Sequence, residues 1–550
     1  MSDMKTQTEP TRPMPAAQPD CAGNFRATAH LSSTDCKTRA QLKIPSSKVI
    51  PVIVIPGIMG SNLCATTDKS KPANRALKPG EAAWRPPNGK LDGLAEAKKW
   101  KARLPPERQQ ILDPETLDVD NTGLLTGSPD GRVEYDAAVL KERGWGEIHA
   151  SSYGGLLSTL EYNLNTVFQS VYGNPELAIN WSALQRYDRK LWNARGDAGV
   201  TAKLTDEQIK KFAQCHYPVY ALGYNWLQSN AVSAARLENR INEIIQFWND
   251  RKQQCSQVIL VTHSMGGLVA RACAKSIPAK ILGIVHGVMP ALGAPVCYRR
   301  IACGTEGGSF VANKFAEIAG RTEADTTAVM AMAAGPLELL PNNQYPKPWL
   351  HATFESADGK SLDQFSLPEG NVYDMYRDTR SWYRMIDPAL ADPSHKYSNP
   401  KEVSQKIALA IRQAEQFHTT LLGDFYHPNS YAFYGDDTVQ QSFSNCRWRA
   451  ARSSAAPDHK VLATGTIDST DAETASRTVK FSNGATIKFT HSVQDGPGDG
   501  TVPQQSGKGP AKGVKRLFST RGYDHQGSYA NEAMLNLTVQ LIVRIAIETE

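Results

Sequence analysis

Long apolar runs are missing from the sequence. The longest candidate, Val49 to Met59, is interrupted by prolines and falls short of the roughly 18 consecutive apolar residues that a membrane-spanning helix needs. The first twenty residues also lack the apolar segment of a secretory signal peptide. We therefore expect a chain that does not cross a bilayer, and whose export, if it occurs, uses a route that reads no such signal.

Charge of one sign is also scarce. The 550 residues include 61 Lys and Arg against 55 Asp and Glu, which gives a net charge of +6 at pH 7, and the excess is not gathered into one basic block. Proteins that bind nucleic acid usually present such a block. The composition therefore excludes nucleic acid as the expected main partner, while weak attraction to anionic phospholipid is compatible with it.

Cysteine patterns typical of metal or redox sites are absent. The nine cysteines form no Cys-x-x-Cys pair, and because their number is odd, at least one has no partner for an intrachain bridge. Cys297 and Cys303 are close enough in sequence to bridge in an oxidising compartment, but two free thiols are the preferred prediction. The sequence predicts neither a metal nor a cofactor.

Apolar segments suited to a buried sheet are present. Hydrophobic residues make up 41% of the chain, and short apolar runs at Lys48–Ile55, Val258–Val261 and Lys280–Val288 alternate with helical patterns such as Leu237–Trp248. Strands that are apolar throughout are typical of parallel sheets with helices on both faces. The sequence therefore predicts an α/β fold with a mostly parallel sheet.

The predicted organisation is an arm followed by a sheet domain with two insertions. The first residues are rich in Pro, Thr, Gln and Ala, which is typical of a mobile arm. Polar, Pro-rich and Gly-rich stretches mark the insertions. The predicted parts are the arm 1–46, the first part of the core 47–295 with an insertion at about 65–135, a cap or lid 296–402, and the second part of the core 403–550.

A serine stands between a predicted strand and a predicted helix. Ser264 is the centre of Thr262-His-Ser-Met-Gly266, a variant of the Gly-x-Ser-x-Gly turn, in which Thr262 is larger than the usual glycine. Such a turn presents the hydroxyl at the carboxyl edge of the sheet, beside the N-terminus of the next helix. We predict that Ser264 is a nucleophile rather than a serine that merely ends a strand. His263 is expected to pack or hydrogen-bond beneath the turn.

A serine hydroxyl becomes a good nucleophile when a base takes its proton and an acid holds the base. Where this turn occurs, the chain order is serine, acid, histidine. His525, in a loop just after the last predicted strand, is the predicted base. Asp499, in a glycine-flanked loop, is the preferred acid, and Asp436 or Asp437 is the alternative.

Attack on an ester carbonyl creates an oxyanion, which two backbone amides can stabilise. The amide of Met265, directly after the nucleophile, is one predicted donor. The other must come from the loop after the first strand, Pro56–Gly60, because its small and apolar residues let the backbone approach a substrate. Met59 is the preferred second donor and Ile58 the near alternative; on its own, the loop could be a simple glycine turn.

Taken together, these segments resemble a known family. The segments are PGIMGSNL (56–63), GYNW (223–226), THSMGG (262–267), GAP (293–295), GPLELLPN (335–342), GDGTVP (498–503) and His525. They resemble the lecithin:cholesterol acyltransferase-like lipase branch of the α/β-hydrolases and, more closely, bacterial lipase effectors of type VI secretion. The resemblance implies an α/β-hydrolase fold, the triad Ser264, Asp499 and His525, and oxyanion donors Met59 and Met265.

The sequence departs from the family pattern at two positions. Asn225 stands where the acyltransferases have Asp before Trp, and Thr262 stands where the turn usually has glycine. These departures argue against acyl transfer to a sterol more than against hydrolysis. The apolar segment 328–340, with Trp349 and Leu350 after it, is expected either to face lipid when the cap opens or to pack on the core.

The expected function is that of a serine lipase or phospholipase that hydrolyses membrane phospholipid or acylglycerol esters through an acyl-enzyme. The alternatives are an acyltransferase that uses an alcohol as acceptor, and a non-catalytic binding or scaffold protein on a hydrolase fold. The resemblance further implies an antibacterial toxin, made in the bacterial cytoplasm and delivered into target cells, where it acts at the membrane surface. Its implied partners are an immunity protein and a component of the secretion spike.

Overall fold

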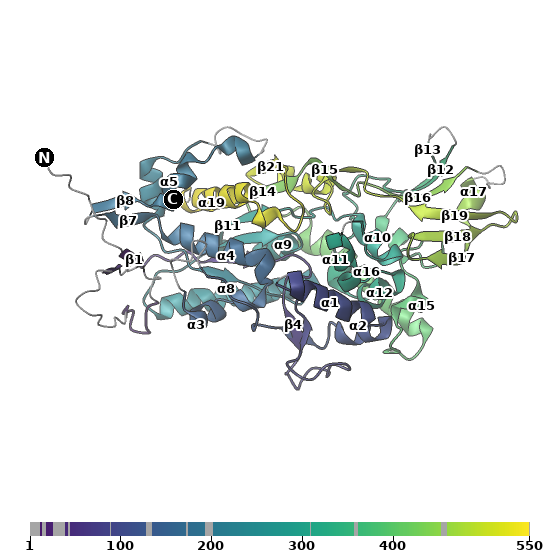
Figure 1. The fold of residues 1–550 in the computed structure, drawn as a ribbon, viewed down its shortest axis with the longest axis horizontal. Helices are drawn as coiled ribbons and strands as arrows, with labels where there is room; N and C mark the ends of the chain where they lie inside the picture. The colour runs from purple at the N-terminus through teal and green to yellow at the C-terminus, as the bar shows by residue number, and fades with distance from the viewer. Residues whose placement is uncertain are drawn as a thin grey trace.

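The computed structural model describes residues 11–13, 18–25, 39–41, 45–88, 90–127, 135–171, 174–192, 202–308, 310–356, 361–452 and 459–548. Most of the predicted mobile arm lies outside the described residues. The described residues of the arm include β1 (Thr11–Pro13) and β2 (Arg39–Gln41), which pair in parallel. The rest of the fold is organised around two six-stranded sheets that lie at different ends of an elongated molecule (Figure 1).

The first sheet is parallel throughout, which confirms the predicted fold class. Its strand order is β9-β3-β10-β11-β14-β21, and every neighbouring pair is parallel. All strands but β21 are buried at every residue, because their sequences are apolar without alternation. The strands are β3 (Val52–Ile55), β9 (Val219–Ala221), β10 (Val258–His263), β11 (Ile281–Gly287), β14 (Ser430–Gly435) and β21 (Arg516–Thr520).

Helices cover both faces of this sheet. Successive strand residues point to opposite faces, so Val52 and Val54 enter one apolar cluster while Ile53 and Ile55 enter the other. The first cluster is completed by α4 (Ala150–Asn165) and α19 (Glu532–Ile547), and the second by α8 (Asn230–Asp250) and α9 (Gly266–Ser276). The sheet is thereby held rigid, and its carboxyl edge becomes a firm base for a site.

The second sheet lies at the end of the molecule away from α5 (Ile179–Arg186) (Figure 1). Its order is β13-β12-β16-β19-β18-β17, and β12 pairs with β16 in parallel. The turn at Asn483-Gly484 joins two of these strands. Residues on both sides of the predicted cap boundary at 402 therefore share one sheet. The strands are β12 (Leu350–Glu355), β13 (Ser361–Leu367), β16 (Cys446–Ala451), β17 (Thr466–Asp471), β18 (Ser476–Lys480) and β19 (Thr486–His491).

The predicted insertion and the predicted cap pack on one another. Helix α1 contacts α11, and α2 contacts α12. In the insertion lie β4 (Leu63–Ala65), β5 (Ala82–Trp84), α1 (Lys90–Ala102), α2 (Pro105–Ile111) and β6 (Leu117–Val119). In the cap lie α10 (Val296–Cys303), α11 (Phe310–Ala319), α12 (Glu323–Met330), α13 (Ala334–Leu337), α14 (Val372–Arg377), α15 (Pro388–Ala391) and α16 (Pro400–Gln416).

The remaining α-helices and β-strands of the described residues are short. They are α3 (Ala137–Glu142), β7 (Phe168–Val171), β8 (Asn174–Leu177), α5 (Ile179–Arg186), α7 (Asp206–Phe212), β15 (Asp437–Ser442), α17 (His459–Ala463), β20 (Gly496–Gly498) and α18 (Gln504–Gly507). Within the described ranges, no helix is long and apolar enough to span a bilayer.

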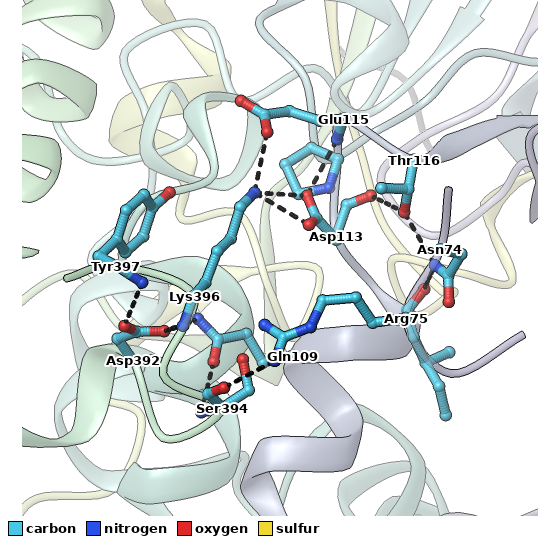
Figure 2. Close-up of polar contacts among 12 residues, drawn as sticks. Asn74, Arg75, Gln109, Asp113, Glu115, Thr116, Asp392, Ser394, Lys396 and Tyr397 are labelled. Atoms are coloured by element: carbon cyan, nitrogen blue, oxygen red, sulfur yellow. Dashed lines mark hydrogen bonds and ion pairs between the residues drawn. The ribbon is translucent and has the colours of Figure 1, made fainter. Parts of the chain in front are cut away.

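A polar junction joins the insertion to the cap (Figure 2). Lys396 Nζ lies 3.0 Å from Asp113 Oδ1 and 2.9 Å from Glu115 Oε2. Beside this ion pair, Gln109 Oε1 accepts a hydrogen bond of 3.0 Å from the amide of Ser394. We call these five residues the insertion–cap junction. The partners in these three contacts lie 281 to 285 positions apart in sequence. The junction therefore fixes two distant segments against each other.

The apolar segment 328–340 is packed inside the protein rather than presented to lipid. Leu337, Leu340, Trp349 and Leu350 are each at most 1% exposed. This packing is what the second sequence interpretation expects. The first interpretation concerns an opened cap and stays a prediction. The eight described cysteines are free thiols, and they include Cys297 and Cys303.

Candidate active site

The turn at Ser264 has the geometry that its sequence predicts. Strand β10 ends at His263, α9 begins at Gly266, and Ser264 between them has a φ of 52°, in the left-handed region that non-glycine residues rarely adopt. A Cβ on Gly266 would lie 2.5 Å from the carbonyl oxygen of Pro56, so only glycine fits there. The strained turn places the serine hydroxyl at the N-terminus of α9.

Thr262, the unusual residue of this turn, has a partner on the neighbouring strand. It is paired in register with His286 of β11, and its hydroxyl lies 3.0 Å from His286 Nδ1. Both side chains are fully buried, and burial lowers the pKa of His286 to about 3, which keeps that ring neutral. The larger residue is thus accommodated by a hydrogen bond below the turn.

Ser264, His525 and Asp499 form one hydrogen-bonded chain. Ser264 Oγ lies 2.8 Å from His525 Nε2, and His525 Nδ1 lies 2.8 Å from Asp499 Oδ2. Because an ionised carboxylate only accepts, the proton of the neutral ring is placed on Nδ1, and Nε2 is left to accept from the serine hydroxyl. This arrangement can perform nucleophilic acyl transfer, although the catalytic role of each residue stays a prediction.

The carboxylate of Asp499 is held by its own loop. Its Oδ1 accepts hydrogen bonds from the amides of Thr501, at 3.0 Å, and Val502, at 2.7 Å. The Asp499 carbonyl oxygen also accepts from the amide of His525, at 2.7 Å. The side chain is 1% exposed. The acid is therefore fixed in position before a substrate arrives.

The alternative acids, Asp436 and Asp437, contact residues around the end of β21 instead of His525. Asp436 Oδ2 accepts from the hydroxyl of Ser519 at 2.8 Å, and Asp437 Oδ2 accepts from the amide of Gly522 at 3.0 Å. Both contacts brace the chain around the end of β21. Of the acids considered, only Asp499 is brought to His525.

The predicted oxyanion donors flank the serine from two segments. Met59 has a φ of 62°, and its carbonyl oxygen accepts a hydrogen bond of 2.8 Å from the indole N–H of Trp84. Met265 precedes the first residue of α9. In the part of the chain that the structure describes, neither amide donates to a protein acceptor, so both are available to a ligand. Their role, and the choice of Met59 over Ile58, stay predictions.

Trp84 and Tyr153 are two site residues that the sequence interpretation missed. Trp84 lies in the insertion, and Tyr153, in α4, accepts a hydrogen bond of 3.0 Å from the amide of Gly57. Gly57 belongs to the predicted oxyanion loop, Pro56–Gly60, which carries Met59. His263 lies beneath the turn as expected, with Nδ1 2.9 Å from Tyr153 Oη. No local pattern marks either missed residue, because each acts through contacts made only in the folded chain.

These features define the class of protein. A parallel sheet covered by helices, with a strained serine turn after a central strand and the order serine, aspartate, histidine, is that of an α/β-hydrolase. Among the described residues, no group of three or more His, Cys, Asp or Glu side chains could hold a metal ion.

Comparisons with known proteins agree with this class. Residues 227–317, which include the serine turn, match the family model of the PGAP1-like alpha/beta domain. In the crystal structure of the Tle4–Tli4 complex, one chain is similar with a TM-score of 0.73 and 27% identity, over 90% of this chain and 98% of that chain. Tle4 is a type VI lipase effector, so this likeness confirms the resemblance predicted from the motifs.

A second solved structure is much less similar. Juvenile hormone epoxide hydrolase from the silkworm Bombyx mori matches with 12% identity over 62% of this chain and 77% of that chain, with a TM-score of 0.18, which is too low to support any inference. No curated protein matches the chain. The comparisons support a lipase-like hydrolase.

Proposed function

We propose that this protein is a serine lipase or phospholipase that cleaves the carboxylic esters of membrane phospholipid or acylglycerol. The observation that carries the proposal is the continuous hydrogen-bonded chain from Ser264 Oγ through His525 to the buried carboxylate of Asp499. The chain's likeness to a lipase effector makes a lipid ester the favoured substrate class.

In the proposed mechanism, His525 Nε2 takes the proton of Ser264 as its oxygen attacks the ester carbonyl carbon. The oxygen of the tetrahedral intermediate receives hydrogen bonds from the amides of Met265 and Met59. His525 then gives its proton to the departing alcohol oxygen, and an acyl-enzyme remains. Water, activated by the same ring, releases the fatty acid. Asp499 stays ionised throughout and stabilises the imidazolium.

The substrate reaches the serine only after part of the protein moves. Ser264 is 4% exposed, and the oxyanion loop in front of it is tied to the insertion through Trp84. This low exposure favours a site that opens before a lipid acyl chain enters. We propose that the insertion and cap shift at a membrane surface, as lids do in other enzymes.

The proposal extends to the biological role. The similar solved chain belongs to a complex of Tle4 with Tli4, which is an effector with its immunity protein. We propose that this chain is likewise an antibacterial type VI effector, delivered into target cells, and that a dedicated immunity protein inhibits it. Loss of ester hydrolysis on addition of a partner encoded beside it would support this role.

Lipid mass spectrometry tests the proposed activity. The purified protein is incubated with vesicles of mixed phospholipid and acylglycerol, with and without an added alcohol acceptor. We expect free fatty acid from the wild type and none above background from Ser264→Ala. Ser158→Ala is the matched control, because the hydroxyl of this buried serine bonds only to carbonyl oxygens of its own helix, α4.

Three results would contradict the proposal. Equal release of fatty acid by wild type and Ser264→Ala would exclude Ser264 as the nucleophile. Acyl esters of the added alcohol as the main product would replace hydrolysis with acyl transfer, the alternative function. Absence of any product from every lipid class, with a folded wild type, would favour a binding or scaffold role.

A further inference from the structure

We infer that Tyr153 and His263 are positioning residues, which together form a hydrogen-bonded bridge between the oxyanion loop and the base of the proposed hydrolase. This inference rests on the proposed function, because it assigns those two segments their tasks. Neither residue is placed to touch the reacting atoms. Each acts by fixing the backbone of a segment that does.

The bridge is a chain of three contacts beneath the serine turn. The amide of Gly57 donates to Tyr153 Oη at 3.0 Å. Tyr153 Oη lies 2.9 Å from His263 Nδ1, and His263 Nε2 lies 3.0 Å from the carbonyl oxygen of His525. Tyr153 and His263 are at most 2% exposed, so water does not compete for these groups.

The partners at the two ends of the bridge determine where its protons lie. The carbonyl oxygen of His525 can only accept, so His263 Nε2 carries a proton. Burial, with the nearby ring of His525, lowers the pKa of His263 to about 3, so the ring is neutral and its Nδ1 must accept. The hydroxyl of Tyr153 therefore donates to His263 and accepts from Gly57. These three contacts fit one arrangement of protons only, and the side chain of Gln526 also hydrogen-bonds to the Tyr153 hydroxyl.

The oxyanion loop rests directly on this bridge. A Cβ on Gly57 would lie 2.9 Å from His263 Nδ1, and a Cβ on Gly60 would lie 2.8 Å from Tyr153 Oη. The rings of Tyr153 and His263 also meet edge to face, with centroids 5.5 Å apart. The position of the loop backbone is thus determined by the position of these two side chains.

The same bridge fixes the backbone of the base. The carbonyl oxygen of His525 is held by His263, and its amide donates to the carbonyl oxygen of Asp499 at 2.7 Å. The bridge thus holds the backbone from which the His525 ring extends, and the contacts of the ring with Ser264 and Asp499 orient it. Breaking the bridge should therefore disturb the base and the oxyanion loop together.

The expected effect is on turnover rather than on binding. A displacement of about 1 Å in a reacting group costs on the order of 100-fold in rate. We expect Tyr153→Phe and His263→Phe each to lower kcat at least about tenfold, with KM within about twofold, because the acyl-binding surface is unchanged. Since both changes interrupt one chain, the double variant should be hardly slower than the slower single variant.

The test measures kcat and KM on a short-chain ester, and the rate at which a fluorophosphonate labels Ser264. Tyr217→Phe is the matched control, because the Tyr217 hydroxyl is equally buried and donates to a backbone carbonyl at 2.9 Å, but in the core away from the site. We expect Tyr217→Phe to lower stability and to label at the wild-type rate. His263→Gln, which keeps a side-chain N–H for the His525 carbonyl, should recover part of the loss.

A loss of less than about tenfold in both rates for Tyr153→Phe, relative to Tyr217→Phe, would overturn the inference. Nitrogen-15 spectra of the histidine rings give a readout that needs no activity. We expect His263 to carry its proton on Nε2 in the wild type, and a proton on Nδ1 would overturn the bridge. If the wild type neither labels nor hydrolyses, the proposed function fails, and the His263 tautomer alone decides the inference.

Discussion

Replacing Glu338 by glutamine should stabilise the protein at alkaline pH. Glu338 follows α13 in the cap and is completely buried. Its carboxylate accepts hydrogen bonds from the hydroxyl of Ser229, at 2.6 Å, and the amide of Asn230, at 2.7 Å, at the start of α8. The residue therefore joins the cap to the first turn of a core helix through a group that can change its charge.

The size of the effect follows from the pKa of this carboxyl. Burial raises the pKa of Glu338 from 4.5 to about 8, although the two donors favour the charged form. Between these values the folded protein keeps a proton that the unfolded chain has lost, so the free energy of unfolding falls as pH rises from 4.5 to 8. At about 1.4 kcal/mol for each pKa unit, the whole fall is at most about 5 kcal/mol.

Glutamine at position 338 keeps the shape and removes the titration. Its oxygen can accept from Asn230, its amide can donate to the hydroxyl of Ser229, and it carries no charge at any pH. Denaturant unfolding of wild type and Glu338→Gln is measured from pH 5 to pH 9. We expect nearly equal stability at pH 5, and an advantage for the variant that grows towards pH 9.

Glu243→Gln is the control for this comparison, because the Glu243 side chain lies on α8 and is 64% exposed. Its effect should be small and nearly independent of pH. A stability difference between wild type and Glu338→Gln that is the same at pH 5 and pH 9 would refute the reasoning. So would a variant that is less stable at pH 9, since the buried charge would then be favourable.

Two further predictions concern the base and the insertion–cap junction. Asp499→Asn should lower kcat on the order of 10⁴-fold on a short-chain ester, because an amide would donate to His525 Nδ1 and favour the wrong tautomer. Asp436→Asn is the control. If Asp499→Asn keeps more than a tenth of the wild-type activity, this prediction is contradicted. Lys396→Met should lower the free energy of unfolding by about 1–3 kcal/mol, because it leaves two carboxylates unpaired, one of them buried. Urea unfolding measures the change, and Lys401→Met, at an exposed side chain, is the control. An equal fall in the free energy of unfolding for Lys396→Met and Lys401→Met would contradict the prediction.

The parallel sheet could be predicted because its central strands β3, β10 and β11 have a local signature. Runs such as Val52–Ile55 are β-branched without alternation, and only burial on both faces explains such a run. The second sheet has no such signature. Its strand β12 pairs with β16, which lies about 90 positions later in sequence, and their side chains alternate or are polar. Which strands meet there depends on packing between distant segments, which sequence patterns do not encode.

The order and loops of the three proposed catalytic residues could be predicted for a related reason. The serine turn needs small residues at fixed spacing. His525 follows β21, a strand of the parallel sheet, and Asp499 follows β20, which pairs with β15. Tyr153 could not be found in this way. It stands in the first turn of α4, and its contact with Gly57 spans 96 positions. Only the fold brings that hydroxyl beneath the oxyanion loop.

The departure at Asn225 is explained by the insertion rather than by the substrate. The side-chain Nδ2 of Asn225 donates to the carbonyl oxygens of Pro114, at 3.0 Å, and Leu117, at 3.3 Å. Its side-chain oxygen accepts from the backbone amide of Leu227. An aspartate could accept from Leu227 but could not donate to the two carbonyl oxygens. The asparagine therefore holds the end of the insertion against the core, at a position where the resembling acyltransferases have an acid. Asn225 is the residue whose presence argued against acyl transfer. Its side-chain nitrogen bonds to the insertion, so this departure from the family pattern leaves hydrolysis at Ser264 unaffected.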